Sequence, residues 1–376
     1  MSSVLSKTML GALVKLAGVE PPPRTNPLTR APRVPRDPIA VEAGTLHAWD
    51  RETNVHLWVA TFDPSLPSGA IATQCAARVV RTTAAAKGVE LAHDGRGFTL
   101  RALPLRTALR CPAPAVPDAP PVPVFPSAGT LEVGLFGKGG PVVHALAASG
   151  PRHPAVWFGD RIFGSDGHRG TVEPGTPGSA RIDGALPAIA VRLLLSLVAD
   201  GADRLFLWRG PLGIAIAAET ATHAWRIACP FDKSLTRSSL ALLDVCLASE
   251  AGALLSVDVA ALQSLVAPLG RKAMLAFYPG GGVVAWDEHA NGAADWLDAT
   301  PGRPAVVLGW DVLGPLTKGM KGTATLRAGR GPLDPSLFAG SVVMPRRGAP
   351  PPDVLERLFG DAGADAIAAW KEGKSA

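Results

Sequence analysis

The sequence has few cysteines, and none lies in a pattern typical of a metal site. The chain has 376 residues and four cysteines, at Cys75, Cys111, Cys229 and Cys246. No two form a CxxC pair and none has a histidine at metal-ligand spacing, so the pattern indicates neither a zinc site nor a disulfide framework. Free cysteine commonly packs as a small hydrophobe. We therefore expect four buried thiols.

Long hydrophobic segments are also lacking. The apolar run at residues 8–14, between Lys7 and Lys15, is too short for a secretory signal and has no small-residue cleavage site. The longest apolar run, residues 185–199, is interrupted by Arg192 and is too short to span a bilayer. The sequence therefore predicts no membrane association and a cytoplasmic protein.

Signatures of common enzyme classes are missing too. There is no GxSxG nucleophile elbow. The glycine-rich stretches at residues 137–140 and 280–282 lack the Lys-Thr ending of a phosphate-binding loop. We expect no catalytic residue, no cofactor, no metal and no enzymatic activity.

Two chemical alternatives stay open at this stage. One is a hydrolytic triad of Ser165, Asp166 and His168, although neighbouring positions in a turn rarely give triad geometry. The other is a metal site. Its possible ligands are His153, Asp160 and His168, or Asp287, Glu288 and His289.

The composition indicates a globular, strand-rich chain. Apolar residues make up 47% and charged residues 18%, which is typical of a folded protein with a sizeable core. The 36 prolines and 41 glycines break the chain often, which favours short strands joined by turns. The net charge of +5 suits a polyanionic partner. Much of it lies in an acid-free, proline-rich stretch at residues 21–36.

A domain-sized repeat organises the chain. Helix, strands, helix and strands follow in the same order three times, with first helices predicted at residues 3–18, 141–148 and 259–269. The second helices are predicted at residues 71–87, 186–199 and 311–319. A proline-rich run at 111–127 and a polar run at 230–239 separate the repeats. The predicted domains are residues 1–127, 128–237 and 238–348, followed by a C-terminal extension, 349–376, with an amphipathic helix or two within 354–371.

Two short strings at the ends of strand-like runs carry the strongest signal. They are SDGHRG at 165–170 and VVMPRRG at 342–348, and they are accompanied by GALPAIAVRLLLSLVADGAD at 184–203 and CPFDKS at 229–234. Residues 1 to about 347 thereby resemble the beta sliding clamp of bacterial DNA polymerase III, or a divergent phage or plasmid relative. The family patterns are TDGHRL and VVMPxRL, so this chain departs from them at Gly170, Arg346 and Gly348. These changes predict a pocket with less apolar wall and more charge.

The resemblance implies an α+β fold of three tandem clamp-type domains, each with two helices over curved antiparallel sheets. Two chains would form a head-to-tail dimeric ring whose helices line a hole around duplex DNA. Contacts would be phosphate contacts without sequence preference. The candidate DNA-binding residues are Arg24, Arg30, Arg33, Arg36, Arg78, Arg81, Lys87, Arg192, Lys318 and Lys321, with Lys7, Lys15, Arg271 and Lys272 as additional cations.

The resemblance also implies a docking pocket for short peptide motifs of DNA polymerases, the clamp loader and repair proteins. Its walls would be Gly167, His168, Arg169, Val342, Met344, Pro345 and Arg347. Apolar walls would accept aliphatic or aromatic anchors. The main alternative is a clamp-fold decoy, inhibitor or scaffold that does not close a ring, and a metal- or triad-dependent hydrolase is a further one. The C-terminal extension could cover or occupy the pocket.

Overall fold

The computed structural model divides the chain into two compact units. It describes residues 2–18, 37–61, 66–82, 88–94, 96–104, 108–111, 114–115, 127–150, 153–175, 182–220, 223–248, 252–295, 304–331 and 334–360. The first unit comprises Met1–Leu146, Pro154–Ile162 and Glu173–Leu235, and the second comprises Ala147–His153, Phe163–Val172 and Thr236–Ala376. The division into three domains stays a prediction.

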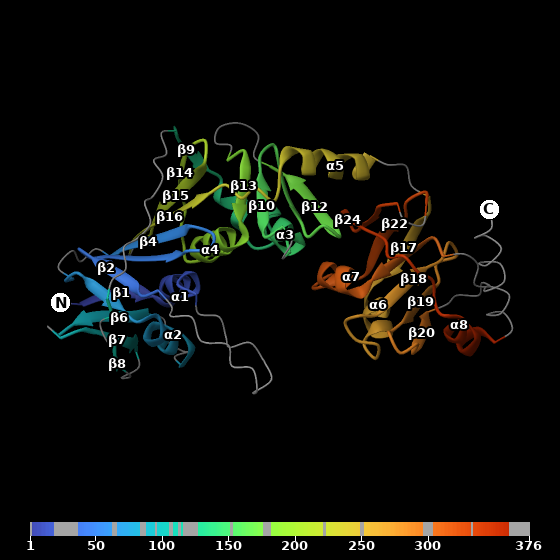
Figure 1. The fold of residues 1–376 in the computed structure, drawn as a ribbon, viewed down its shortest axis with the longest axis horizontal. Helices are drawn as coiled ribbons and strands as arrows, with labels where there is room; N and C mark the ends of the chain where they lie inside the picture. The colour runs from blue at the N-terminus through green and yellow to red at the C-terminus, as the bar shows by residue number, and fades with distance from the viewer. Residues whose placement is uncertain are drawn as a thin grey trace. The chain divides into compact units, whose positions relative to one another are not determined.

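Antiparallel sheets form the frame of the first unit (Figure 1). One sheet has the order β1-β6-β7-β8, with strands Ser2–Ser6, Gly88–His93, Phe98–Leu103 and Ala108–Cys111. A second has the order β5-β2-β3-β4-β16-β15-β14-β9, with strands Gly69–Ile71, Ile39–Glu42, Thr45–Asp50, Val55–Thr61, His223–Pro230, Gly213–Glu219, Leu205–Arg209 and Ser127–Leu131. Strands β10 (Ala155–Phe158) and β13 (Gly184–Pro187) form a further pair. The pairing of β4 with β16 joins parts of the chain that are far apart in sequence.

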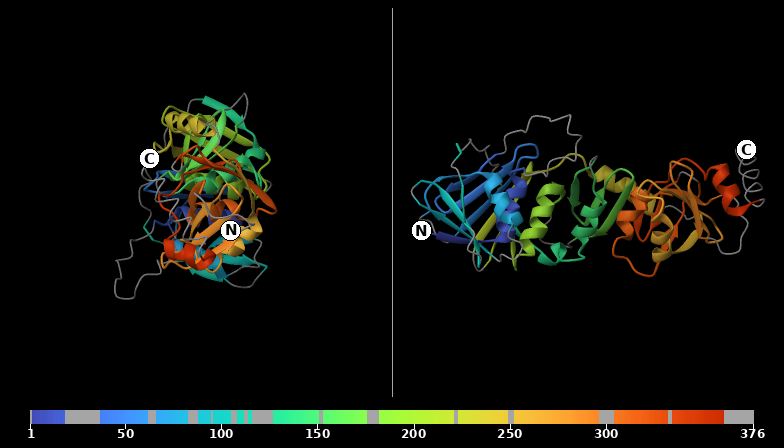
Figure 2. Two further views of the ribbon diagram at one scale, coloured as in Figure 1. Left: turned by 90° about the vertical axis from the view of Figure 1, so that its right-hand side faces the viewer. Right: turned by 90° about the horizontal axis from the view of Figure 1, so that it is seen from below.

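The helices of the first unit lie together against these sheets. They are α1 (Lys7–Leu16), α2 (Thr73–Thr82) and α4 (Ala188–Val198), with α1 in contact with the other two (Figures 1 and 2). The Ser6 hydroxyl caps α1 by accepting a 3.0 Å hydrogen bond from the Met9 N–H. Leucines of α1 and α4 belong to one continuous core with the strands. The short η1 (Val133–Phe136) and α3 (Pro141–Ala148) complete the described helices between β9 and β10.

The second unit has the same kind of construction. One group of strands pairs in the order β12-β24-β23-β22-β17, with bounds Arg169–Pro174, Ser341–Val343, Ser336–Phe338, Thr323–Arg327 and Leu254–Asp258. Strand β11 (Arg161–Ser165) precedes β12. The other sheet is β20-β19-β18-β21, with bounds Gly292–Asp295, Val283–Trp286, Met274–Phe277 and Val306–Gly309. Its helices are α5 (Arg237–Ala248), α6 (Val259–Val266), α7 (Trp310–Thr317) and α8 (Pro352–Phe359).

Helix α8 shows where the C-terminal extension begins to pack. Val354 and Leu355 are buried in a cluster with Tyr278, which directly follows β18, and with Trp286 of β19. The expectation of an amphipathic helix within residues 354–371 is thus confirmed for residues 354–359, and the helix begins two residues earlier, at Pro352. The rest of the predicted helical stretch, from residue 361, lies outside the described residues.

Several helix boundaries differ from the sequence-based expectation. Ile71 belongs to β5, and α2 begins at Thr73. Helix α6 ends at Val266, where the sequence predicted residue 269. Residues 2–6 form β1, which pairs with β6, and α1 begins only at Lys7. Residues 186 and 187 belong to β13, and α4 begins at Ala188. A short apolar run satisfies the period of a strand and of a helix alike, so pattern alone could not place these boundaries.

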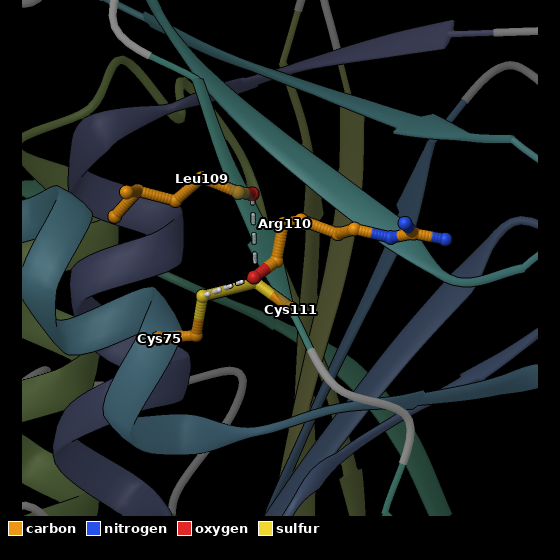
Figure 3. Close-up of a disulfide and its surroundings, with 4 residues drawn as sticks. All are labelled: Cys75, Leu109, Arg110 and Cys111. Carbon is orange, nitrogen blue, oxygen red and sulfur yellow. Dashed lines mark hydrogen bonds between the residues drawn. A yellow bond between two sulfur atoms is a disulfide. The ribbon is translucent and has the colours of Figure 1, made fainter.

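The cysteine expectation was wrong for three of four residues. Cys75 of α2 and Cys111 of β8 form a disulfide with a Cα–Cα separation of 5.8 Å (Figure 3). Cys229 is a buried free cysteine, as expected, but the free Cys246 is partly exposed. The sequence separation of 36 gave no sign of the pairing, because the two sulfurs meet only through the packing of α2 on β8.

No helix in the described ranges is long and apolar enough to cross a membrane.

Candidate functional site

The site in the second unit begins with the tight turn between β11 and β12. Asp166 Oδ1 accepts hydrogen bonds from the backbone N–H groups of His168 and Arg169, at 2.8 and 2.9 Å. The Ser165 hydroxyl donates to the Arg169 carbonyl oxygen at 2.8 Å. Gly167 has φ +84°, a left-handed conformation that favours glycine. These residues therefore fix the position at which His168 and Arg169 leave the turn.

Strand β24 brings the second sequence motif to this turn. Arg169 pairs with Val343 and Gly170 with Val342 in the antiparallel register of β12 and β24. Beyond the last ladder pair, the Met344 N–H donates to the His168 carbonyl oxygen at 2.7 Å. The two strings that stand far apart in the sequence therefore form one continuous backbone surface.

The predicted pocket residues differ in exposure. Met344 is 36% exposed, whereas Val342 is 3% exposed and belongs to the sheet interior. Gly167 and Arg347 are exposed, and His168, Arg169 and Pro345 are partly buried. The accessible apolar contact at this site thus comes mainly from Met344 and Pro345.

Arg169 is held in place on two sides. Its Nε donates to Asp166 Oδ2 at 3.0 Å, and its Nη1 lies 3.4 Å from the carbonyl oxygen of Val312 in α7. The side chain is 10% exposed. Arg169 therefore connects the turn to α7, so its arrangement is that of a positioning group.

The extra charge expected from Arg346 is balanced within the fold. The guanidinium of Arg346 donates to Asp311 Oδ2 at 2.7 Å, and its backbone N–H donates to the Val307 carbonyl oxygen at 2.8 Å. Asp311 was not among the sequence-based candidates. The only signal for it was an acidic residue at the start of a predicted helix, which is common for helix-dipole reasons alone.

Gly170 lies buried in β12 beside Val342 of β24. A glycine here contributes no side chain, and the expected loss of apolar wall in a peptide pocket stays a prediction. Nearby, the Thr171 and Ser341 hydroxyls form a buried hydrogen bond of 2.9 Å.

The same geometry bears on the two chemical alternatives. The Ser165 hydroxyl and the Asp166 carboxylate hydrogen-bond to the turn backbone and Arg169, and neither contacts the His168 ring by a hydrogen bond. Asp287 likewise accepts hydrogen bonds from the backbone N–H of His289 and from the side chain of Asn291. The hydrogen bond from the Asn291 side chain is the main cause that lowers the pKa of the Asp287 carboxyl. In the described parts of the chain no three His, Cys, Asp or Glu side chains gather as a metal site would require.

The DNA-binding candidates divide between the two units. Arg78 and Arg81 lie exposed on α2, and Arg192 lies exposed on α4. Lys318 and Lys321 are exposed just after α7 in the second unit. The remaining candidates, Arg24, Arg30, Arg33, Arg36 and Lys87, lie outside the described residues.

Comparison with solved structures identifies the fold. A DNA polymerase sliding clamp from Caulobacter crescentus matches 93% of this chain with 100% of its own length, at TM-score 0.60 and 16% identity. The DNA polymerase III beta subunit of Thermotoga maritima covers the same shares at TM-score 0.61 and 10% identity. The DNA polymerase III beta chain of Streptococcus pneumoniae matches 92% of this chain with 99% of its own, at TM-score 0.63 and 12% identity. No protein-family model and no curated protein matches the sequence.

The chain therefore has the α+β fold of the bacterial DNA polymerase III beta sliding clamps.

Proposed function

We propose that the chain is a DNA sliding clamp: a homodimeric ring in the cytoplasm that encircles duplex DNA and docks polymerase-type partners. The likeness to proteins described as DNA polymerase sliding clamps, over nearly the full length of both chains, supports this proposal. On this proposal the protein is a processivity factor and performs no catalysis itself.

The observation that carries the DNA-binding part is the charge on three neighbouring helices. Helices α1, α2 and α4 contain no Asp or Glu at all. Their charged residues are Lys7, Lys15, Arg78, Arg81 and Arg192, of which all but Lys7 are exposed. A purely cationic helical surface suits loose contacts with phosphates, which hold DNA without reading its sequence.

The peptide-docking part rests on the turn at His168 and the end of β24. Met344 supplies an accessible thioether that adapts to varied apolar anchors. Backbone groups of the turn and the exposed Arg347 supply polar contacts at its rim. The balanced pair Arg346–Asp311 leaves this surface less basic than the sequence alone suggests.

A threading experiment tests encirclement directly. Labelled duplex DNA is offered in three forms of equal length: linear with free ends, linear with both ends blocked by bulky protein, and closed circular. A ring enters and leaves linear DNA only over a free end. Bulky protein is therefore added to the ends of the first form after incubation, and we expect retention on that form and little on the other two at moderate salt.

Equal retention on all three forms would show ordinary surface binding and would favour the decoy or scaffold alternative. The variant Arg192→Glu serves as a check on the contact surface, because it should weaken retention on the free-ended DNA without creating retention on the blocked forms.

A further inference from the structure

The eight-stranded sheet of the first unit has an unusual face turned away from its core. In β4, Val55, Leu57 and Val59 belong to the core, so the alternating His56, Trp58 and Ala60 lie on the opposite face. In β16 the same alternation places Arg226 on that opposite face, between the core residues Trp225 and Ile227.

Planar side chains form a ladder across this face. Arg226 Cζ lies 5.8 Å from the ring centroid of Trp58 and 5.7 Å from that of Trp208, so the guanidinium lies between two indoles. On the far side of Trp58, the His47 ring stacks at 4.8 Å with an interplanar angle of 1°. The strand order β3-β4-β16-β15-β14 brings these four residues together.

Small residues between the planar groups leave a hollow. Ala60, Ala217 and Ala224 line it together with the Trp58, Trp208 and Arg226 side chains, and its volume is about 210 Å³. Phe206, which is 40% exposed, lines it as well. Because alanine has no side-chain atoms beyond Cβ, the three alanines form a shallow apolar floor of the hollow, and the two indoles and the guanidinium project above it.

The hollow has two charged lining residues, Arg226 and Glu219, and no ion pair between them is found. Arg226 is exposed, and among the described residues no carboxylate forms an ion pair with it. The neighbouring His47 is uncharged at neutral pH, because burial, and then the proximity of His56, lower its pKa to about 4. Arg226 thus presents N–H donors to solvent from a fixed position between two aromatic faces.

We propose that this hollow, here called the Trp58–Trp208 hollow, binds a peptide segment of another protein that presents a carboxylate beside an aromatic or aliphatic side chain. The carboxylate accepts hydrogen bonds from Arg226, and the apolar side chain packs on the alanine floor against the indoles. Tryptophan and arginine are the residue types that most often dominate protein-binding surfaces.

The charge pattern favours a peptide over a nucleic acid. Binding a nucleic acid chain takes several cations along the phosphate backbone. The hollow has one arginine, and Glu219 is part of its lining. A peptide with one carboxylate beside an apolar side chain is complementary to this hollow, in which Arg226 lies beside the apolar alanine floor.

The test uses a random heptapeptide phage library selected on the full-length chain. Selected peptides are synthesised with a fluorescein label, and their affinities are measured by anisotropy for the wild type and for three variants, Arg226→Ala, Arg226→Lys and Met344→Ala. The last separates this hollow from the His168–Met344 site. Circular dichroism of each variant checks folding, which the exposed Arg226 position should not disturb.

We expect a group of peptides with Asp or Glu next to an aromatic or aliphatic residue. Arg226→Ala should weaken their binding at least about tenfold, and Met344→Ala should leave it unchanged. Arg226→Lys should recover only part of the loss, because lysine keeps the charge without the planar fork. Replacing the peptide acid by its amide should weaken binding to the wild type but not to Arg226→Ala.

Three results would overturn the proposal. They are selected peptides without an acid, binding insensitive to Arg226, or no Arg226-dependent peptide at all. A labelled dT12 oligonucleotide serves as the competing probe, and Arg226-dependent binding of it in place of the peptides would show a nucleic acid site. The outcome does not depend on whether the chain closes a ring.

Discussion

The backbone N–H of Met344 donates a 2.7 Å hydrogen bond to the carbonyl oxygen of His168. This bond extends the ladder of β12 and β24 by one step beyond the pair Arg169–Val343. It places the accessible Met344 side chain beside a turn whose shape is set by Asp166. Changes in the turn are therefore expected to reach the apolar contact.

Met344 should be the main apolar contact of the proposed docking site. Met344→Ala removes the thioether from a surface position, so we expect a labelled peptide with aliphatic and aromatic anchors to bind about tenfold or more weakly, with unchanged stability. Fluorescence anisotropy measures the affinity. Leu254→Ala is the control, because Leu254 is 72% exposed on β17 and is not part of the site. Equal effects of the two substitutions would contradict this role of Met344.

Asp166 should stabilise the turn. Asp166→Ala leaves two backbone N–H groups and Arg169 without their acceptor, so we expect a loss of about 1–3 kcal/mol in the free energy of unfolding. Urea unfolding measures it, and peptide affinity should fall in parallel. Asp353→Ala on the exposed surface of α8 should cost less than about 0.5 kcal/mol. A neutral Asp166→Ala would show that the turn keeps its shape without these bonds.

The cations of α2 and α4 should set the salt dependence of DNA binding. Arg81→Glu and Arg192→Glu should weaken binding to every duplex sequence alike. Each lost phosphate contact should reduce the slope of log affinity against log salt by about 0.9. Anisotropy with labelled duplex DNA over a salt series gives the slope. Arg357→Glu on α8 is the matched control, and a drop of the same size there would indicate a general charge effect.

The disulfide should stabilise the first unit. Reduction, or Cys75→Ser, frees α2 from β8, and closing a loop of this length typically contributes about 2–4 kcal/mol. Thermal unfolding with and without reductant should therefore show a lower midpoint for the reduced chain. Cys246→Ser should change nothing, since Cys246 is free. Thiol titration of the unreduced, unfolded chain should find Cys229 and Cys246 only, and reaction of all four cysteines would contradict the pairing.

His47 should make stability fall in acid. Its pKa is lowered from 6.5 to about 4 in the folded state, so the unfolded chain binds the proton more readily. The contribution of His47 to the free energy of unfolding is therefore fully present above pH 6.5 and decreases as the pH drops toward 4. Below pH 4 this residue causes no further loss. The loss is about 2 kcal/mol when partial exposure is allowed for.

Urea unfolding from pH 7.5 to 4 measures this dependence. His47→Gln should flatten the profile over this range relative to the wild type. The neutral pair is also favoured by hydrogen bonding: His56 Nε2 donates to Asn54 Oδ1 at 3.1 Å, which leaves His56 Nδ1 to accept from His47 Nε2 at 3.1 Å. Parallel profiles for the variant and the wild type would show that His47 does not titrate in this way.

The sequence predicts the parts of the fold that are local. The strings at 165–170 and 342–348 are each formed by consecutive residues, so they can be recognised in the sequence. That the two strings lie side by side was expected from the family resemblance. The helix predicted at residues 141–148 is confirmed as α3, Pro141–Ala148.

What the sequence does not predict depends on packing between distant elements. Arg226 lies between Trp58 and Trp208 only because β16 pairs with β4 on one side and β15 on the other. The disulfide and the Arg346–Asp311 pair arise in the same way. These contacts join residues that are far apart in the sequence. They can be predicted only when the register of the sheet or the packing position of the helix is already known.

The solution mass is the most direct test of the sliding-clamp proposal. Light scattering is measured on the full chain from low micromolar upward, at moderate salt. A closed ring requires two chains, so we expect a mass near twice 38.8 kDa at low micromolar concentration. A chain that stays at 38.8 kDa at high concentration would contradict the sliding-clamp proposal and leave a clamp-fold scaffold or decoy as the better description.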